Sequence, residues 1–240
     1  MNWFKSWFDS KYYHILYKNR NEKEAQIFID NLISHLQIQK KSKILDVACG
    51  KGRHATYFNK KGMNVIGIDL SINNIKTAKK KENETLQFAV HDMRNPFKTN
   101  EFDIVTNLFT SFGYFEKNKD EQKAINAMAS SLKKGGILII DFMNVKKVIK
   151  SLILSEDKLI NNINFKIRRS IVDDCIIKDI KISSNGKHYT FKEKVKALTL
   201  IDFSNFITNS KLQIINTFGN YKLEDFNALT SERLIIICKK

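Results

Sequence analysis

Short apolar runs and amphipathic stretches alternate along the first 142 residues of the chain. The apolar runs predict strands, which we place at residues 44–47, 65–68, 86–90, 102–105 and 137–141. Apolar residues recur at helical spacing in residues 22–36 and 120–132, so these stretches predict helices packed on the strands. Asn21 and Glu24 form a capping box ahead of the first helix. Strands that alternate with helices in this way are typical of an α/β fold with a parallel sheet.

The pattern changes after residue 142. Apolar and polar residues then alternate with the period of a strand in three stretches, residues 165–172, 175–182 and 187–198. Asp173-Asp174 and Ser184-Asn185-Gly186 separate these stretches, and both are turn sequences that favour hairpins. The pattern predicts an antiparallel β meander inserted into the parallel fold. The remaining expected elements are a helix and two strands, at residues 200–208, 212–218 and 233–238.

Residues 44–71 combine a strand, a glycine loop, a helix and a second strand that ends in Asp69. This order is half of a nucleotide-binding βαβ unit. Gly50 and Gly52 lack Cβ atoms, so the backbone can turn sharply and approach a ligand closely. The helix that starts near Arg53 directs its N-terminal amides into the same space. Asp69 lies about twenty residues beyond the first strand, where a carboxylate can accept both hydroxyls of a ribose.

Asp46 extends the glycine loop to the pattern Asp-x-Ala-x-Gly-x-Gly, which resembles the class I S-adenosylmethionine-dependent methyltransferases. The resemblance implies that Asp46 helps to hold the methionine end of the cofactor, and that Ala48, Gly50 and Gly52 leave room for it. The glycine spacing also fits a loose dinucleotide fingerprint. A nicotinamide-dependent dehydrogenase is a distant alternative, because Ala55 stands in place of the third glycine.

Later segments continue the resemblance in chain order, over residues 44–142. The cofactor-binding residues that it implies there are Asp69, Leu70, Asp92, Met93, Asn107 and Leu108. In this family Asp69 would bind the ribose, Asp92 would accept the adenine amino group, and the backbone amide of Met93 would meet the ring. Asn107 and Leu108 would open the loop beside the methyl group. The implied cofactor is S-adenosyl-L-methionine, and the implied fold is a Rossmann-like seven-stranded sheet with helices on both faces, plus the β meander.

We therefore expect three parts in the chain, an N-terminal aromatic lid segment (residues 1–20), a Rossmann-like domain that binds S-adenosylmethionine (residues 21–145 and 199–240) and an inserted antiparallel β cap (residues 146–198). The first segment holds more aromatic side chains than an exposed tail normally carries, so we expect it to pack over the cofactor. Members of the resembled family often use such a lid. The resemblance implies a tyrosine near the methyl group, Tyr12 or Tyr13, and Arg20 on the methionine carboxylate.

A sulfonium methyl group is already activated, so transfer depends mainly on holding the acceptor in line with it. No catalytic triad is therefore expected. An amine must arrive neutral and a hydroxyl must lose its proton, so a nearby side chain can act as a general base. The candidates are Tyr13, His14 and Tyr114. Aromatic rings at Tyr12, Phe112 and Tyr114 would favour a cationic centre.

The chain carries 41 Lys and Arg against 25 Asp and Glu, a formal net charge of +16. Such a charge favours an anionic partner such as nucleic acid. The basic residues are dispersed as doublets, however, and abundant Lys, Asn, Ile and Phe beside 9 Gly and 1 Pro is typical of A/T-biased codon use. A small-molecule acceptor with an N or O nucleophile is favoured. The alternatives are an RNA methyltransferase and a noncatalytic cofactor-binding regulatory module.

The three cysteines, Cys49, Cys175 and Cys238, are widely spaced and include no Cys-x-x-Cys pair. They predict neither a disulfide framework nor a metal site. The sequence has no run of about eighteen apolar residues, the length that predicts a membrane-spanning helix. The N-terminus lacks the apolar core of a signal peptide. We expect a cytoplasmic protein that does not bind membranes, and the sequence leaves its oligomeric state open.

Overall fold

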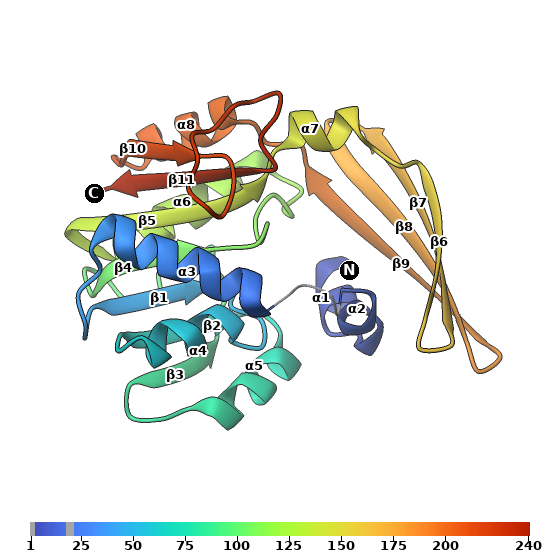
Figure 1. Cartoon of the computed structure of the whole chain (residues 1–240), viewed down its shortest axis with the longest axis horizontal. Helices are drawn as coiled ribbons and strands as arrows, with labels where there is room; N and C mark the ends of the chain where they lie inside the picture. Colours follow the sequence, from blue (N-terminus) through green and yellow to red (C-terminus); the bar gives the residue numbers. More distant parts are fainter. Residues whose placement is uncertain (1–2, 18–21) are drawn as a thin grey trace.

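The computed structural model describes residues 3–17 and 22–240, which form two sheets and the helices around them (Figure 1). The larger sheet has seven strands in the order β10-β11-β5-β4-β1-β2-β3. These strands are β1 (Lys43–Val47), β2 (Asn64–Asp69), β3 (Leu86–Val90), β4 (Phe102–Asn107), β5 (Leu132–Met143), β10 (Gln213–Phe218) and β11 (Arg233–Lys239). All pairs are parallel except those of β11, which runs antiparallel to β5 and β10. The expected Rossmann-like α/β fold is confirmed.

Helices cover both faces of this sheet, because successive residues of a strand point to opposite faces. In β1, Ile44 packs with one group of helices, whereas Leu45 and Val47 pack with the other. The first group is α3 (Glu22–Leu36), α4 (Arg53–Lys60) and α5 (Ile72–Ala78); the second is α6 (Asn118–Ser131) and α8 (Leu200–Asn209). In the described part of the chain, no helix is long and apolar enough to cross a membrane.

Three local features differ from the expected elements or refine them. β5 begins directly after α6, because Leu132 already pairs with Phe102 before the backbone bulges and resumes pairing at Ile137. The short helices α7 (Val145–Lys150) and η1 (Lys79–Lys81) escaped prediction, since a helix of one or two turns shows no repeating apolar pattern. Ser71 caps α5, since its side-chain oxygen accepts a hydrogen bond from the amide of Asn74 at 3.0 Å. The proposed capping box includes Asn21, which lies outside the described residues.

The second sheet has four antiparallel strands in sequence order, β6 (Ser155–Ile160), β7 (Ile163–Val172), β8 (Cys175–Ser184) and β9 (Lys187–Lys196). The expected meander is confirmed, but the prediction missed β6. This strand is largely exposed and polar, so it shows no apolar alternation. Both predicted turns hold two consecutive residues with positive φ, Asp173-Asp174 and Asn185-Gly186, as type I′ hairpin turns require.

The N-terminal helices α1 (Trp3–Phe8) and α2 (Lys11–Leu16) lie between the two sheets (Figure 1). Trp7 and Tyr12 are buried against Phe165 and Ile180 of the smaller sheet. The carboxylate of Glu193 in β9 anchors the segment at a polar site within this apolar contact. It accepts hydrogen bonds from Trp7 Nε1 at 2.6 Å and from the Tyr17 hydroxyl at 2.7 Å, and it pairs with Lys178 Nζ at 2.8 Å.

A second buried ion pair joins the two sheets. Glu121 of α6 is fully buried and pairs with Lys196 at the end of β9 at 2.9 Å. Burial raises the pKa of the Glu121 carboxyl, and Lys196 opposes this rise. The backbone amide of Lys196 also donates to the carbonyl of Gly113, at 2.8 Å. The smaller sheet is thereby tied to the loop that follows β4.

Glu193→Gln should lower the free energy of unfolding by about 1–3 kcal/mol at neutral pH, because the half-buried Lys178 loses its charged partner. Burial alone would raise the pKa of the Glu193 carboxyl, but Lys178, Tyr17 and Trp7 together hold it below its ordinary value of 4.5. The stabilisation is therefore present above that pH and is lost as the pH falls through the lower pKa of the folded protein. Urea unfolding at pH 7 and near pH 3.5 measures the difference between the two proteins.

The difference between wild type and variant should shrink on acidification. Asp157→Asn, on the exposed face of the same sheet, is the matched control and should change stability by less than about 0.5 kcal/mol. A difference that does not vary with pH would show that the charge of Glu193 contributes nothing.

Candidate functional site

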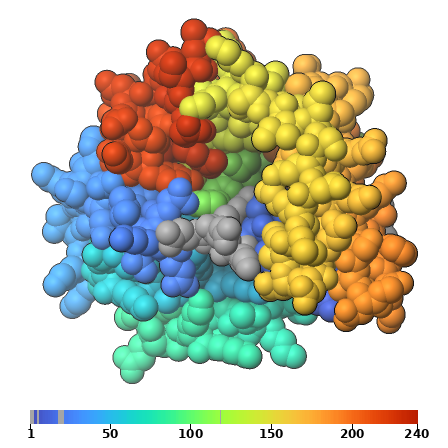
Figure 2. Space-filling model, turned by 45° about the vertical axis from the view of Figure 1, so that its right-hand side comes forward, coloured from blue at the N-terminus to red at the C-terminus, as the bar shows by residue number. Residues whose placement is uncertain are grey.

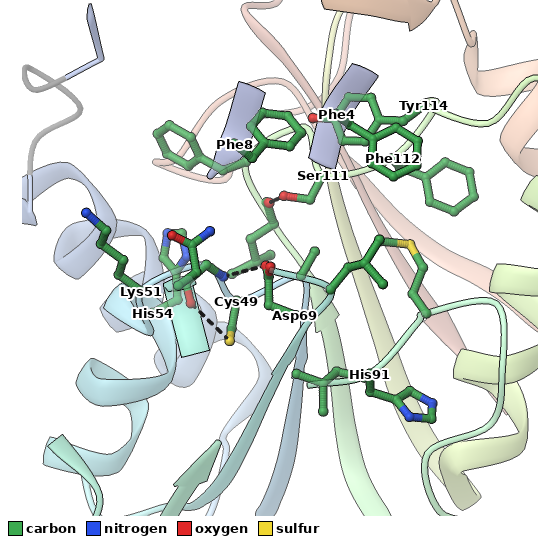
Figure 3. A pocket seen from close by; sticks show the side chains of 18 of the residues that line it. Phe4, Phe8, Cys49, Lys51, His54, Asp69, His91, Ser111, Phe112 and Tyr114 are labelled. Carbon is green, nitrogen blue, oxygen red and sulfur yellow. Dashed lines mark hydrogen bonds between the residues drawn. The ribbon is translucent and has the colours of Figure 1, made fainter. Parts of the chain in front are cut away.

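A cavity of about 300 Å³ opens at the carboxyl ends of β1, β2 and β4, where open α/β sheets bind ligands. The loops after β1, β2 and β3 form one side, and α1, α2 and the loop after β4 form most of the other (Figure 3). The space-filling view shows green residues recessed between the blue, red and yellow parts of the chain (Figure 2). Loops of the larger sheet and the N-terminal helices thus line one site, and none of its described lining residues comes from the smaller sheet.

The glycine loop turns from β1 into α4 through three residues with positive φ, Ala48 (60°), Gly50 (57°) and Gly52 (76°). Ala48 and Gly50 line the cavity. A Cβ atom at Gly50 would meet no atom within 4 Å, whereas one at Gly52 would lie 2.5 Å from the ring of Phe88. Gly50 therefore leaves space open for a ligand. Gly52 instead allows α4 to pack on β3, and it is not among the residues that line the cavity.

Asp69 ends β2 at the edge of the cavity and faces the glycine loop (Figure 3). One carboxylate oxygen accepts from the amide of Gly50 at 2.9 Å, and the other accepts from the amide of Ser71 at 2.8 Å. Burial raises the pKa of the Asp69 carboxyl, and these two amides oppose the rise. Each oxygen has further acceptor capacity for a ligand hydroxyl. The adjacent Leu70 also lines the cavity.

Asp46 and Asn107, two of the expected cofactor residues, are not among the residues that line the cavity. Both are buried below its floor and tie β1 to β4. Thr106 donates to one oxygen of Asp46 at 2.9 Å, and Asn107 donates to the carbonyl of Val47 at 3.1 Å. Among the described residues, the other oxygen of Asp46 and the side-chain oxygen of Asn107 have no partner. Burial raises the pKa of the Asp46 carboxyl to about 7.

Tyr12 and Tyr13, the alternatives for the tyrosine near the methyl group, lie in different surroundings. Tyr12 is buried in the contact with the smaller sheet, where its ring lies 4.9 Å from that of Tyr189, and it does not line the cavity. Tyr13 lies one position on, so it points from α2 toward the other side and lines the cavity. Arg20 lies outside the described residues.

Asp92 and Met93 line the cavity in the loop after β3. Arg94, which prediction missed, binds Asp92 through Nε at 3.0 and 3.1 Å and through a terminal nitrogen at 2.5 Å. This bonding lowers the pKa of the Asp92 carboxyl. Arg94 also stacks on Phe115, at 5.2 Å from the ring centroid. The pair holds the acid in one orientation at the cavity edge.

Aromatic rings form the wall opposite the glycine loop (Figure 3). Phe4, Phe8 and Tyr13 come from the N-terminal helices, while Phe112 and Tyr114 come from the loop after β4. The ring of Tyr114 lies 5.5 Å from that of Phe8, which in turn lies 5.0 Å from that of Tyr13. Segments about one hundred residues apart therefore build one aromatic surface, which we call the aromatic wall.

Two histidines that line the cavity, His14 and His54, have lowered pKa values. Burial lowers the pKa of His14 to about 4, and the nearby charge of Lys51 contributes. Burial lowers the pKa of His54 to about 3, with a contribution from Arg53. Tyr13, His14 and Tyr114, the three candidate bases, all line the cavity. A neutral imidazole can accept a proton there, although its low pKa makes His14 a weak base.

The loop after β4 contains two strained residues, Phe109 and Thr110, with φ of 64° and 58°. Such a conformation costs about 1–3 kcal/mol for each non-glycine residue and persists only where neighbours enforce it. Here the buried Asp141 at the end of β5 enforces it. Its carboxylate accepts from the amide of Phe109 at 2.8 Å, and its carbonyl accepts from the amide of Thr110 at 2.9 Å.

Sequence reasoning placed Asp141 at a strand end but found no role for it, and it missed Arg233 and Tyr221 altogether. Arg233 pairs with Asp141 at 2.8 Å, and the Tyr221 hydroxyl donates to the same carboxylate at 3.1 Å. These contacts span about ninety residues of chain, so no local motif could indicate them. The described residues contain no group of three or more His, Cys, Asp or Glu side chains that could hold a metal ion.

Comparison with known proteins agrees with this geometry. Residues 45–140 match the model of the Methyltransferase domain family. An uncharacterized protein of Methanocaldococcus jannaschii is 28% identical over 87% of this chain and 81% of its own length. The dTDP-3-amino-3,4,6-trideoxy-alpha-D-glucopyranose N,N-dimethyltransferase of Streptomyces venezuelae is 32% identical over 101 residues, 42% of each chain.

A solved structure has the same fold over nearly the whole chain. It is an S-adenosylmethionine-dependent methyltransferase from Clostridium acetobutylicum, with a TM-score of 0.79, 21% identity and coverage of 95% of both chains. The glycine loop and the acid at the end of β2 both lie within the part of the chain that matches the Methyltransferase domain family, residues 45–140. The chain as a whole has the fold of the solved methyltransferase.

Proposed function

We propose that this enzyme methylates an amino group of a small molecule, with a hydroxyl oxygen as the second choice of acceptor atom. The observation that carries the proposal is the aromatic wall, which faces the glycine loop across the cavity. A small acceptor fits a cavity of this size between the N-terminal helices and the loops of the larger sheet. The curated relative in Streptomyces venezuelae, by its name, dimethylates an amino sugar, which supports an amine.

The described residues fit the cofactor. Gly50 leaves open space where any side chain would intrude, and Asp69 offers acceptor capacity for the two ribose hydroxyls. Leu70, Met93 and Leu108 supply apolar surface along the same side of the cavity. When bound, S-adenosyl-L-methionine supplies a methyl group that its sulfonium already activates.

Asp92 is the proposed partner of the adenine amino group. Arg94 occupies both of its oxygens, yet each oxygen can accept a second hydrogen bond. Asp46 and Asn107 act from below, by holding the ends of β1 and β4 in register under the loop. Ala48 completes the loop at the cavity wall.

The remaining task of the protein is to place a neutral nucleophile in line and to exclude water. Tyr13, His14 and Tyr114 are the residues that could take a proton from the acceptor. The nitrogen of an amine becomes positive as it accepts the methyl group. Aromatic faces attract such a charge, so the aromatic wall favours the transition state more than the neutral reactant.

Gly50→Ala should weaken cofactor binding about tenfold or more, because the new methyl group projects into the cavity. Gly52→Ala makes a matched comparison, since both glycines have positive φ. It should instead lower the melting temperature by several degrees, through the clash with Phe88. Calorimetric titration with S-adenosylmethionine and thermal unfolding separate the two effects. Equal loss of affinity in both variants would contradict the different roles given to the two glycines.

Asp69→Asn should weaken binding of S-adenosylmethionine about tenfold or more, since a charge-assisted hydrogen bond contributes roughly 1.5–3 kcal/mol. The matched control is Asp103→Asn, at the opposite end of the sheet, where the carboxylate pairs with Lys133. The control should bind the cofactor as wild type does. Unchanged affinity of the Asp69 variant would remove Asp69 from the ribose site.

Methyl-labelled S-adenosylmethionine tests the acceptor class directly. We expect label on a nucleotide-linked amino sugar or another small amine, little label on the matching hydroxyl compound, and none on RNA. Phe8→Leu should reduce kcat/KM for the amine by about threefold to thirtyfold, the range of a cation–π contact. Tyr189→Leu, an aromatic residue outside the cavity, is the control and should leave the value unchanged. Label on RNA that survives physiological salt would overturn the proposal.

A further inference from the structure

Strain in the loop after β4 is concentrated at residues that border the cavity. Phe109 and Thr110 are consecutive non-glycine residues in the left-handed region. Phe109 and Ser111 line the cavity, and the Tyr114 hydroxyl of the aromatic wall donates to the carbonyl of Thr110. Since a strained backbone relaxes unless its neighbours hold it, the groups that hold Thr110 also set the position of this wall.

Arg233, the first residue of β11, is one of these groups. Its Nε donates to Asp141 at 2.8 Å, and a terminal nitrogen donates to the hydroxyl of Thr110 at 3.0 Å. The side chain is only 18% exposed, and that of Asp141 is fully buried. A planar guanidinium directs its donors in fixed directions, so it joins the two partners in one geometry.

The same guanidinium also contacts the ring of Phe109. The guanidinium of Arg233 lies 5.8 Å from the centroid of this ring, and the guanidinium of Arg53, at the start of α4, lies 4.5 Å from it. The ring of Tyr221 stacks on Phe109 at 6.0 Å. Phe109 is thus held between the C-terminal part of the chain and the start of α4. Arg233 itself does not line the cavity, so it can influence the site only through these residues.

We infer that Arg233 is a positioning residue for methyl transfer, which holds Phe109 and Thr110 so that the aromatic wall presents the acceptor to the cofactor. The inference rests on the proposed function. Misplacement of an acceptor by about 1 Å can cost on the order of a hundredfold in rate. Of the proposed cofactor contacts only Leu108 lies on this loop, whereas Gly50 and Asp69 lie elsewhere, so cofactor binding should depend little on Arg233.

If Arg233 had a purely structural role, it would only neutralise the charge of Asp141. Substitutions at Thr110 distinguish that role from the positioning role, because the hydrogen bond from Arg233 to the Thr110 hydroxyl holds the loop and does not neutralise the buried carboxylate. Thr110→Val removes that acceptor while keeping the β-branched shape. Thr110→Ser keeps the acceptor. We therefore expect kcat to fall about tenfold in the Val variant, by a loss of orientation, and to stay within about twofold in the Ser variant.

Arg233→Lys should show the same pattern, because an ammonium group cannot bridge Asp141 and Thr110 with a fixed fork. We expect kcat to fall about tenfold or more, with the Kd for S-adenosylmethionine within about twofold of wild type. The double variant with Thr110→Val should be no slower than the slower single variant, because both substitutions remove the same hydrogen bond, from Arg233 to the Thr110 hydroxyl. Arg169→Lys is the matched control, since Arg169 pairs with Glu156 in the smaller sheet and should leave kcat unchanged.

Hydrogen exchange at the amides of Phe109 and Thr110 gives a readout that needs no substrate. Both amides donate to Asp141, and their exchange should accelerate in the Arg233 variant while that of β4 and β5 does not. If wild type binds the cofactor but methylates no amine, the proposed acceptor is wrong, and the exchange data still test Arg233. The inference is overturned if Thr110→Val and Thr110→Ser turn over equally fast, or if exchange is unchanged. If Arg233→Lys fails to fold, the Thr110 pair decides the matter.

Discussion

The carboxylate of Asp141 lies fully buried at the carboxyl end of β5, and a buried charge is costly unless it is paired and hydrogen-bonded. Its partners come from three places, Arg233 on β11, Tyr221 before that strand, and the amide of Phe109 after β4. Satisfying this one group therefore brings the C-terminal strand beside β5 and bends the loop after β4 into the left-handed region. The wall of the cavity is a consequence of that requirement.

Two further buried carboxylates extend the same principle to the rest of the molecule. Glu193 accepts hydrogen bonds from Trp7 and Tyr17 and pairs with Lys178, which attaches the N-terminal helices to the smaller sheet. Glu121 pairs with Lys196, which attaches that sheet to α6. Buried ion pairs contribute little net stability, but leaving one partner unpaired costs several kcal/mol. They consequently specify how the parts join, while the apolar clusters on both faces of the larger sheet supply most of the stability.

The two sides of the cavity, the cofactor side and the aromatic wall, are built differently because of this assembly. The loops after β1, β2 and β3 are local to the parallel sheet and, together with Leu108 after β4, carry the proposed cofactor contacts. The aromatic wall is assembled from the N-terminal helices and the loop after β4, two segments that touch only because the smaller sheet holds one of them. A composite wall of this kind can change with the inserted sheet while the cofactor side stays the same. The acceptor is therefore the property that such a fold can vary most readily.

Local chemistry explains what could be predicted. The apolar runs of the sheet, the hairpin turns at Asp173-Asp174 and Asn185-Gly186, and the cap at Ser71 are each set by residues adjacent in the chain. The same holds for Ala48, Gly50 and Asp69 at the cavity, because one βαβ unit brings them together. The division of the chain at residues 146–198 and the roles of the individual site residues remain predictions.

The sequence could not show in which direction each side chain points, or which residues far apart in the chain come into contact. Tyr12 and Tyr13 are equivalent in composition, but adjacent residues of a helix point about 100° apart, and only packing against Phe165 and Ile180 decides which one is buried. Gly52 and Gly50 share a motif, yet the ring of Phe88, on another strand, gives Gly52 a packing role. Arg233 gains its role from Asp141 and Thr110, far away in the chain. Local residue patterns alone predicted the sheet, the glycine loop and the resemblance to methyltransferases. Which side chains reach the cavity depends on contacts between segments that lie far apart in the chain, and no local pattern indicates those contacts.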